Sequence, residues 1–234
     1  VEYEPLPTVS ELHEALDPEI PALHDYGDGL YGGGGNVHKR VSMRFGAVEE
    51  GFGDADLILD ETYFYSGSTH LPLEQHGAVA VPEDGDRVTL YSSTQTPHYV
   101  QRTLAKVLQI PQSKVRVVAC PNGGGFGGKS DVFGHEIVVA ALALRLGRPV
   151  KIVLTREEVF YCHRGRHPVL MQMRTGFDRR GRMLAQHLRT ALDGGAYGSY
   201  GVASTYYTGA LQTLTYQLPR YRFEGLRVFT NKPP

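Results

Sequence analysis

The sequence has few cysteines, no strong charge of either sign and no long apolar run. Two cysteines, Cys120 and Cys162, do not make a disulfide framework, so we expect a reducing, cytoplasmic setting. A formal net charge of −1 predicts no nucleic-acid partner. No stretch reaches the roughly 18 apolar residues of a membrane span. The N-terminus also lacks the basic and then apolar pattern of a signal peptide.

Glycine, by contrast, is in excess: the chain has 28, above the usual share of roughly 7%. The glycines gather at 27–35, 123–128 and 194–201. Because the first cluster holds four consecutive glycines, a linker is predicted over 25–36. We therefore predict a connecting segment at 1–40 and a single domain at 41–234.

Strands and helices are expected to alternate from about residue 42. Apolar residues at helical spacing predict helices over 97–109 and 132–146, and a further helix is expected over 203–213. Alternating and β-branched runs, separated by turn residues, predict the strands. These lie at about 79–81, 88–91, 114–119, 150–154, 169–177, 182–192 and 221–230. The pattern predicts an α+β (mixed α/β) fold of mixed sheets with antiparallel hairpins and packed helices.

The second glycine cluster, Gly123–Ser130, reads G-G-G-F-G-G-K-S and satisfies the P-loop pattern of nucleotide-binding proteins. A P-loop usually follows the first strand of its sheet, whereas half of this chain precedes the cluster. Asp60 and Asp193 are poor candidates for the magnesium-holding aspartate. Phe126, in the middle of the loop, adds nothing obvious to a phosphate cradle. A P-loop nucleotide-binding protein therefore remains as an alternative.

The glycines of this loop have the same physical effect whether the ligand is a nucleotide or another anion. Consecutive glycines reach positive φ and let the backbone approach a ligand closely. Successive N–H groups can then converge on an anion at the N-terminus of the following helix. A tight turn without a ligand needs one or two glycines, so five among Gly123–Gly128 favour a binding loop.

The loop Gly123–Lys129 resembles the signature of the molybdenum-binding large subunits of the xanthine oxidase family. Six other segments agree with that family in order and spacing. Residues 70–74 resemble a family strand that ends in a glutamate. The other five segments are 93–96, 147–151, 155–158, 166–168 and 230–233. Within the family, four segments look most like the catalytic subunit of 4-hydroxybenzoyl-CoA reductase: 128–131, 133–136, 161–167 and 203–207.

The resemblance implies roles for particular residues. Gln95 would lie near molybdenum, with its amide beside the apical ligand of the metal. The backbone of Gly124, Gly125, Phe126 and Gly127 would contact the cofactor, and the Phe126 ring would line the substrate slot. Tyr207 would donate a proton or hydrogen bond to the substrate.

Two departures from the family also matter. Purine-oxidising members carry a glutamate where this chain has Ser130. They also carry an arginine near the position where this chain has Tyr207. Both differences imply an aromatic, less polar substrate.

The family's catalytic glutamate would lie beyond residue 234. Because the chain also opens at Val1 without an initiator methionine, we expect a fragment of a longer subunit.

The implied activity is the reductive dehydroxylation of 4-hydroxybenzoyl-CoA to benzoyl-CoA, a step of aromatic degradation. The implied cofactor is molybdenum–molybdopterin in its cytosine dinucleotide form. Iron–sulfur clusters and FAD would lie on partner subunits, in a dimer of heterotrimers. A molybdenum hydroxylase acting on an aromatic aldehyde or N-heterocycle is the nearer alternative, and a non-catalytic paralogue without cofactor is a further one.

Overall fold

The structure, a computed structural model, describes residues 2–25, 34–162 and 164–233. The chain divides into two compact units: Val1–Ser68 with Arg166–Pro234, and Thr69–Gly165. Each unit packs helices on a sheet that contains antiparallel pairs, so the α+β prediction is confirmed. The division into a connecting segment and one domain stays a prediction, and the central part of the expected linker, 26–33, lies outside the described residues.

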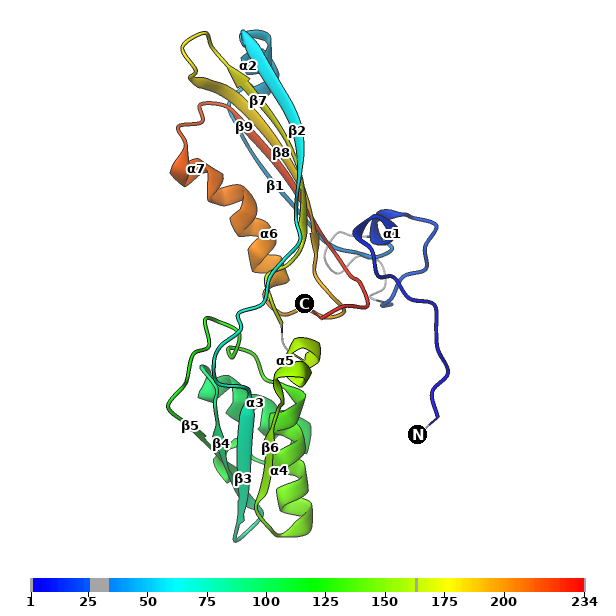
Figure 1. Ribbon diagram of the computed structural model, residues 1–234, viewed down its shortest axis with the longest axis vertical. Helices are drawn as coiled ribbons and strands as arrows, with labels where there is room; N and C mark the ends of the chain where they lie inside the picture. The colour runs from blue at the N-terminus through cyan, green and yellow to red at the C-terminus, as the bar shows by residue number, and fades with distance from the viewer. Residues whose placement is uncertain (1, 26–33, 163, 234) are drawn as a thin grey trace. The chain divides into compact units, whose positions relative to one another are not determined.

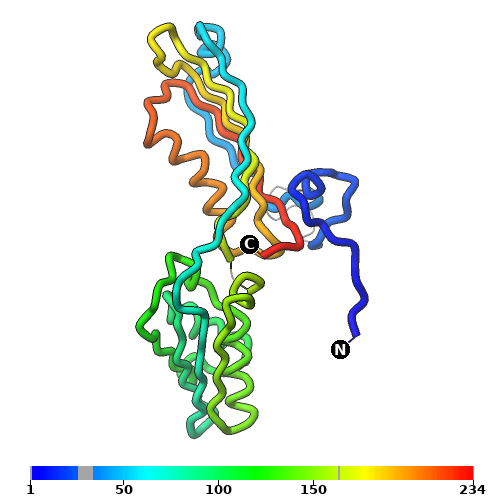
Figure 2. Tube along the Cα trace, in the orientation of Figure 1, coloured from blue at the N-terminus to red at the C-terminus, as the bar shows by residue number. Residues whose placement is uncertain are grey.

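The first unit contains a five-stranded sheet in which β8 and β9 run parallel and the other neighbours run antiparallel. The strand order is β1 (Val37–Phe45), β9 (Tyr221–Val228), β8 (Met183–Asp193), β7 (Val169–Phe177) and β2 (Leu57–Tyr65). Figure 2 shows β2, in cyan, beside β7, in yellow, although the two strands are far apart in the sequence. The second unit is inserted between them in the chain.

Helices cover the five-stranded sheet on both faces. On one face α6 (Gly201–Ala210) and α7 (Gln212–Thr215) lie along the sheet (Figure 1), where the fully buried side chains of Leu188, Tyr221 and Phe223 form the core. On the other face α1 (Leu12–Leu16) and α2 (Val48–Gly53) cover the two ends of the sheet.

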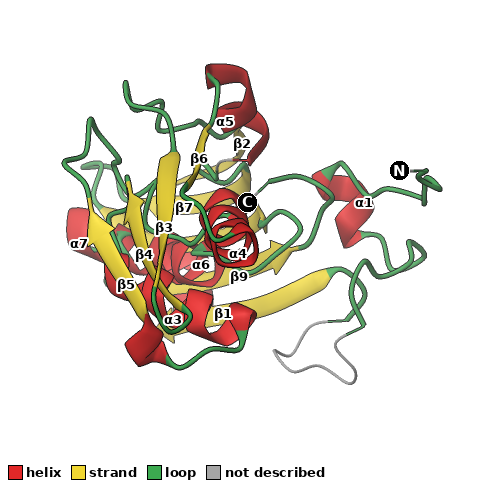
Figure 3. Cartoon of the chain, turned by 90° about the horizontal axis from the view of Figure 1, so that it is seen from below, coloured by secondary structure: helices red, strands yellow, loops and turns green. Residues whose placement is uncertain are grey.

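The second unit contains a four-stranded sheet covered by two helices. Its strand order, visible in Figure 3, is β5 (Val115–Ala119), β4 (Arg87–Ser92), β3 (Gly77–Glu83) and β6 (Val150–Val153). The helical elements are α3 (Pro97–Leu108), η1 (Gln112–Lys114), α4 (Gly134–Leu146) and α5 (Arg156–Cys162). Because β4 and β5 run parallel, their connection must cross the sheet, and α3 makes that crossover.

The core of this unit lies between the sheet and the helices α3 and α4. Leu104 of α3 and Val139 of α4 are fully buried there, against Leu90 of β4. We expect Leu104→Ala to lower the free energy of unfolding by about 2–5 kcal/mol, because it removes buried methyl groups and leaves a cavity. Urea unfolding would measure the effect, and the half-exposed Val107 on the same helix provides the control, whose alanine variant should change stability by less than about 1 kcal/mol.

The loops that form the candidate site meet at one edge of the four-stranded sheet. The register pairs Ser92, the last residue of β4, with Ala119, the last residue of β5. The first residue of β3, Gly77, pairs with Val153, the last residue of β6. The segments just before β3 and just after the other three strands therefore meet at this edge.

The segment His70–Glu74 corrects the sequence-based expectation of a strand. It forms no strand, and β3 begins at Gly77. Leu71 has a φ of 41°, and the carbonyl oxygens of Pro72 and Leu73 accept hydrogen bonds from the Arg156 guanidinium. The backbone therefore pairs with a side chain instead of a neighbouring strand.

Of the helices that the structure describes, none combines the length and apolar character that crossing a membrane requires.

Candidate functional site: a glycine loop at the edge of a sheet

The glycine loop follows β5 and lies at the sheet edge described above. Gln95 comes three residues after the end of β4, so the carboxyl ends of two neighbouring parallel strands bring Gln95 and the loop together. Ligands commonly bind at such strand ends. Phe126 and Gly127 have φ values of 52° and 89°, and the Gly128 N–H donates to the Gly125 carbonyl oxygen at 2.7 Å. The loop is therefore a tight turn with left-handed backbone.

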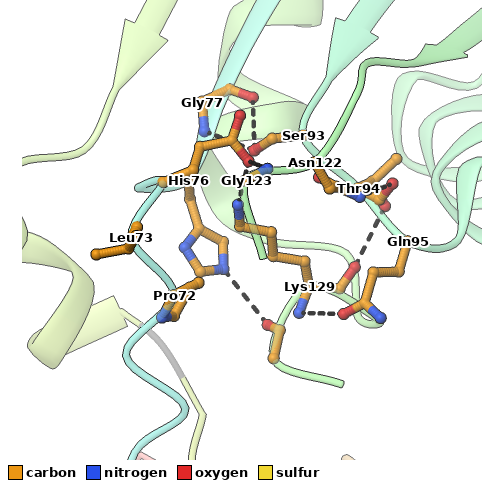
Figure 4. A network of polar contacts seen from close by, with 12 residues as sticks. Pro72, Leu73, His76, Gly77, Ser93, Thr94, Gln95, Asn122, Gly123 and Lys129 are labelled. Atoms are coloured by element: carbon orange, nitrogen blue, oxygen red, sulfur yellow. Dashed lines mark hydrogen bonds and ion pairs between the residues drawn. The ribbon is translucent and has the colours of Figure 1, made fainter. Parts of the chain in front are cut away.

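Gln95 holds the far side of this turn. Its side-chain oxygen Oε1 accepts from the N–H group of Gly127 at 3.1 Å. It also accepts from the N–H group of Lys129 at 3.1 Å (Figure 4). The backbone N–H of Gln95 donates to the Lys129 carbonyl oxygen at 2.9 Å. A Cβ on Gly125 would lie 2.5 Å from Gln95 Oε1, so this position requires glycine. Because two N–H donors must face the amide oxygen, the NH₂ group of Gln95 is directed away from them.

Glu74 and Lys129 hold the near side. The Lys129 ammonium, 1% exposed, lies 2.5 Å from Glu74 Oε2, and the same oxygen accepts from the Gly123 N–H at 3.0 Å. The Glu74 carboxylate is 35% exposed and so keeps contact with solvent. Glu74 thus connects the first residue of the loop to its last.

Arg164 supports the loop from outside. Its guanidinium donates to the Gly127 carbonyl oxygen at 2.7 Å and pairs with the Asp131 carboxylate. Gly127 is therefore held through its N–H by Gln95 and through its carbonyl by Arg164. Charged groups of this kind make stronger hydrogen bonds than neutral ones.

The tip of the loop keeps its own donors available. Among the residues that the structure describes, the N–H groups of Gly124, Gly125 and Phe126 donate to no group of the chain. The Phe126 side chain is 73% exposed, and its ring lies about 3.2 Å from where a Cβ on Gly124 would stand. Three consecutive free amides beside a neutral carboxamide suit an anionic ligand that already carries its metal, because they add donors without competing as metal ligands.

One expectation about the loop is wrong, and the structure also argues against the P-loop alternative. The anion site was expected at the N-terminus of the following helix, but α4 begins at Gly134, after Phe133 as its N-cap. Gly128 and Ser130 close two successive turns, and Phe126 and Gly127 have left-handed backbone, so the loop is not the first turn of the helix. The P-loop alternative also expects a lysine free to reach phosphate, whereas the Lys129 ammonium is buried on Glu74.

The remaining predicted residues are placed as follows. Ser130 is half-buried, and its carbonyl oxygen accepts from the Thr96 hydroxyl at 3.0 Å. Tyr207 is 58% exposed on α6 and belongs to the first unit, so its role toward a substrate stays a prediction. Within the described ranges, no group of three or more His, Cys, Asp or Glu side chains is arranged to bind a metal ion.

Sequence reasoning missed the residues that fix the loop from behind. It named Glu74 and Lys129 as parts of motifs, but it assigned them no contact with each other. It gave Arg164 no role. A carboxylate and a lysine far apart in the sequence carry no local signal of pairing, so this ion pair could be found only in the structure.

Low pH should reduce the folding stability of the second unit because of His135. The Nδ1 atom of His135 is buried without a hydrogen-bond partner among the described residues. Burial, and then the nearby His76, lower the pKa of His135 to about 4. The unfolded chain, with a pKa near 6.5, takes up its proton first, so stability should fall as pH drops from about 6.5 towards 4. We expect a loss on the order of 1–3 kcal/mol.

Urea unfolding of the wild-type chain and of His135→Leu at pH 7 and pH 5 would measure this loss. Burial raises the pKa of the neighbouring Glu136, which opposes the histidine effect because a proton bound more tightly in the folded state stabilises it in acid. The comparison with His135→Leu isolates the histidine, since Glu136 is present in both. An equal pH dependence in the two proteins would contradict the prediction.

The fold and the loop together define a domain that can hold an anionic cofactor at one edge of a sheet. The sequence profile of the family described as "Molybdopterin cofactor-binding domain" matches residues 32–234, and the chain belongs to this family. The predicted membership in the molybdenum-binding part of the xanthine oxidase family is thereby confirmed. The narrower resemblance to 4-hydroxybenzoyl-CoA reductase stays a prediction.

Three known proteins show the extent of the similarity. The chain is 38% identical over 231 residues to a probable xanthine dehydrogenase subunit of Bacillus subtilis (strain 168), covering 99% of this chain and 30% of that protein. It is 33% identical to the "Nicotinate dehydrogenase large molybdopterin subunit" of Eubacterium barkeri, covering 100% of this chain and 53% of the relative. The structure of quinoline 2-oxidoreductase from Pseudomonas putida 86 matches with a TM-score of 0.86 and 31% identity, over 100% of this chain and 29% of that one. The chain therefore spans about half or less of the length of these relatives.

Proposed function

We propose that this chain forms the cofactor-binding part of the catalytic subunit of a molybdenum-dependent oxidoreductase. The observation that carries the proposal is the orientation of Gln95. The N–H groups of Gly127 and Lys129 occupy its amide oxygen, which leaves the amide NH₂ as a donor beside the free amides of the loop tip.

The residues of the chain would act as fixed, neutral donors. The N–H groups of Gly124, Gly125 and Phe126 would bind oxygen atoms of the anionic pterin cofactor, and the Gln95 NH₂ would donate to a ligand of the metal. When bound, the molybdenum centre supplies two-electron redox chemistry. Donors already fixed by Gln95, Glu74 and Arg164 need no rearrangement as charge changes, which is the condition for effective electrostatic stabilisation.

The relatives support hydroxylation of an aromatic N-heterocycle as the reaction of the whole protein. Their names specify xanthine and nicotinate dehydrogenases, and a structural neighbour is a quinoline oxidoreductase. In this reaction an aromatic C–H and water give C–OH, with two protons and two electrons released to an acceptor. The exposed ring of Phe126 would stack against such a flat substrate.

Reductive dehydroxylation of 4-hydroxybenzoyl-CoA is the second candidate. It is supported by the segments that resemble this reductase and by Ser130, which removes the carboxylate of purine-oxidising members. The reaction consumes two electrons and two protons, replaces the ring C–OH with C–H and releases water. Tyr207 would donate a hydrogen bond to the phenolic oxygen.

The partners follow from the same proposal. The relatives are named as subunits, so we expect iron–sulfur and flavin subunits, arranged as a dimer of heterotrimers, to exchange electrons with the cofactor. We also propose the cytosine dinucleotide form of the pterin and a cytoplasmic location.

Metal and product analysis of the whole protein, purified with its partner subunits, tests the proposal. We expect about one molybdenum per copy of the chain. Hydroxylation of quinoline, nicotinate or xanthine with a dye as electron acceptor would support the first reaction. Conversion of 4-hydroxybenzoyl-CoA to benzoyl-CoA with a strong reductant would support the second. Absence of molybdenum and pterin would overturn the proposal in favour of a non-catalytic paralogue, and magnesium-dependent ATP hydrolysis would favour a nucleotide-binding protein.

A further inference from the structure

Four basic residues and one aspartate form a row across one face of the five-stranded sheet in the first unit. The strand register places one residue of each strand side by side in this order: Arg44 on β1, Arg222 on β9, His187 on β8, Arg174 on β7 and Asp60 on β2. We call these five residues the cationic row. All of them lie on the sheet face opposite α6 and α7, because side chains alternate between faces along each strand.

Within the described residues of the first unit, α2 and the segment around α1 cover the two ends of this face, and α2 reaches the cationic row where the Arg174 guanidinium lies 4.7 Å from the centre of the Phe52 ring. At one end α2 packs Val48 and Phe52 on Ala185 of β8. At the other end the segment around α1 packs Val9 and Ala15 on Val228 of β9. Between these covered ends, Arg44, Arg174 and Asp60 are exposed, and the row borders a hollow of about 270 Å³. The described residues of this unit therefore bury the apolar ends of the face and leave charged residues between them exposed.

Positive charge exceeds negative charge on this face. The neighbouring row contains Arg189 and Glu224, and Arg40 lies one row further on β1. The accessible part of this face thus carries five arginines, at positions 40, 44, 174, 189 and 222, against two carboxylates, at positions 60 and 224, of which Asp60 lies 3.9 Å from the Arg174 guanidinium. A third carboxylate on the face, Asp193, is buried and pairs with Lys232. The Arg222 hydrogen bond, with those of His187 and Arg189, lowers the pKa of Glu224 to about 2, so two arginines and one histidine share this single carboxylate.

The arrangement destabilises the sheet in the isolated chain. Arg44 lies directly opposite Arg222 in an antiparallel pair, and like charges directly opposite each other destabilise a sheet. Among the described residues, neither Arg40 nor Arg44 has an ion-pair partner. Carboxylates supplied from outside would relieve this repulsion and complete the pairing.

We propose that the cationic row docks an acidic, carboxylate-bearing surface of another subunit of the same enzyme, an inference that rests on the proposed function. Charge complementarity selects the partner, since aspartate and glutamate side chains match guanidinium groups in geometry and sign. The row also contains Asp60 and is flanked by Thr62 and Gln172, a mixture of donors and acceptors that suits a protein surface better than the uniform phosphates of a nucleic acid.

Charge reversal in the assembled enzyme tests this docking surface. The double variant Arg44→Glu with Arg174→Glu is compared with the wild type and with Arg148→Glu plus Arg180→Glu, which makes the same change of charge at two exposed turns. We expect the dissociation constant for a partner subunit to rise by about 10-fold or more at about 100 mM salt in the first variant only. Screening should reduce the difference at about 1 M salt.

Cross-linking identifies the occupant. A photo-reactive benzoylphenylalanine at Thr62, beside the row, should cross-link to an aspartate- and glutamate-rich peptide of another subunit. Cross-links to the chain's own polypeptide, to a second copy or to nucleic acid would overturn the proposal, as would an equal loss of association in the control variant. Molybdenum content is measured in every preparation: its absence from the wild type contradicts the proposed function, whereas its retention in a dissociated variant confirms that the cofactor site remains intact.

Discussion

Glu74→Ala is expected to lower the free energy of unfolding of the unit that holds the glycine loop by about 3–5 kcal/mol. The substitution leaves the Lys129 ammonium, which is 1% exposed, without its carboxylate. It also removes the acceptor of the Gly123 N–H. The cost arises mainly from a buried charge without a partner, and the pair itself need not add net stability.

Substitution of the other partner, Lys129, separates the cost of the unpaired buried charge from the net stability of the ion pair. Lys129→Met removes the buried charge and leaves Glu74, a third exposed, in contact with water, so it should cost less than Glu74→Ala. The double variant should recover part of the stability lost in Glu74→Ala. Urea unfolding combined with hydrogen exchange at Gly123 would measure these differences. Glu157→Ala, at an exposed carboxylate, is the matched control and should change stability by less than about 0.5 kcal/mol. Equal effects of all three single variants would contradict the explanation.

Gln95→Glu is expected to lower molybdenum-dependent turnover by about 10²–10³-fold while the loop stays folded. A glutamate at this position keeps an oxygen that accepts from the Gly127 and Lys129 N–H groups. It loses the amide donor and places a negative charge beside an anionic cofactor. Turnover and pterin content of the purified enzyme would measure the loss.

Two comparisons identify the cause. Gln95→Ala removes the acceptor as well, which leaves the buried Lys129 N–H unsatisfied and should cost a further 1–3 kcal/mol or so of stability. Gln217→Glu adds the same charge at an exposed position of the other unit and should leave turnover near wild type. If Gln95→Glu keeps full turnover, the Gln95 amide does not act on the cofactor.

Local sequence predicted most elements because their signals are local. The helices at 97–109 and 132–146 follow the spacing of apolar residues and agree with α3 and α4. The hairpin of β7 and β8 was predicted from two runs around a turn. The expected strand at His70–Glu74 was wrong, because its backbone carbonyls bind the Arg156 side chain, a contact that no local pattern indicates.

The sequence by itself predicted the glycine loop, because the loop depends on the φ values that glycine permits. It also predicted the family, because the order of motifs along a chain can be compared without coordinates. The resemblance implied only that Gln95 and the loop face the same cofactor, and the structure showed that they contact each other. Tertiary structure decided what the charged residues do. The burial of Lys129 on Glu74 and the alignment of the cationic row depend on the pairing of distant strands. Strand register follows from the packing of whole sheets, so a single segment of sequence does not contain it.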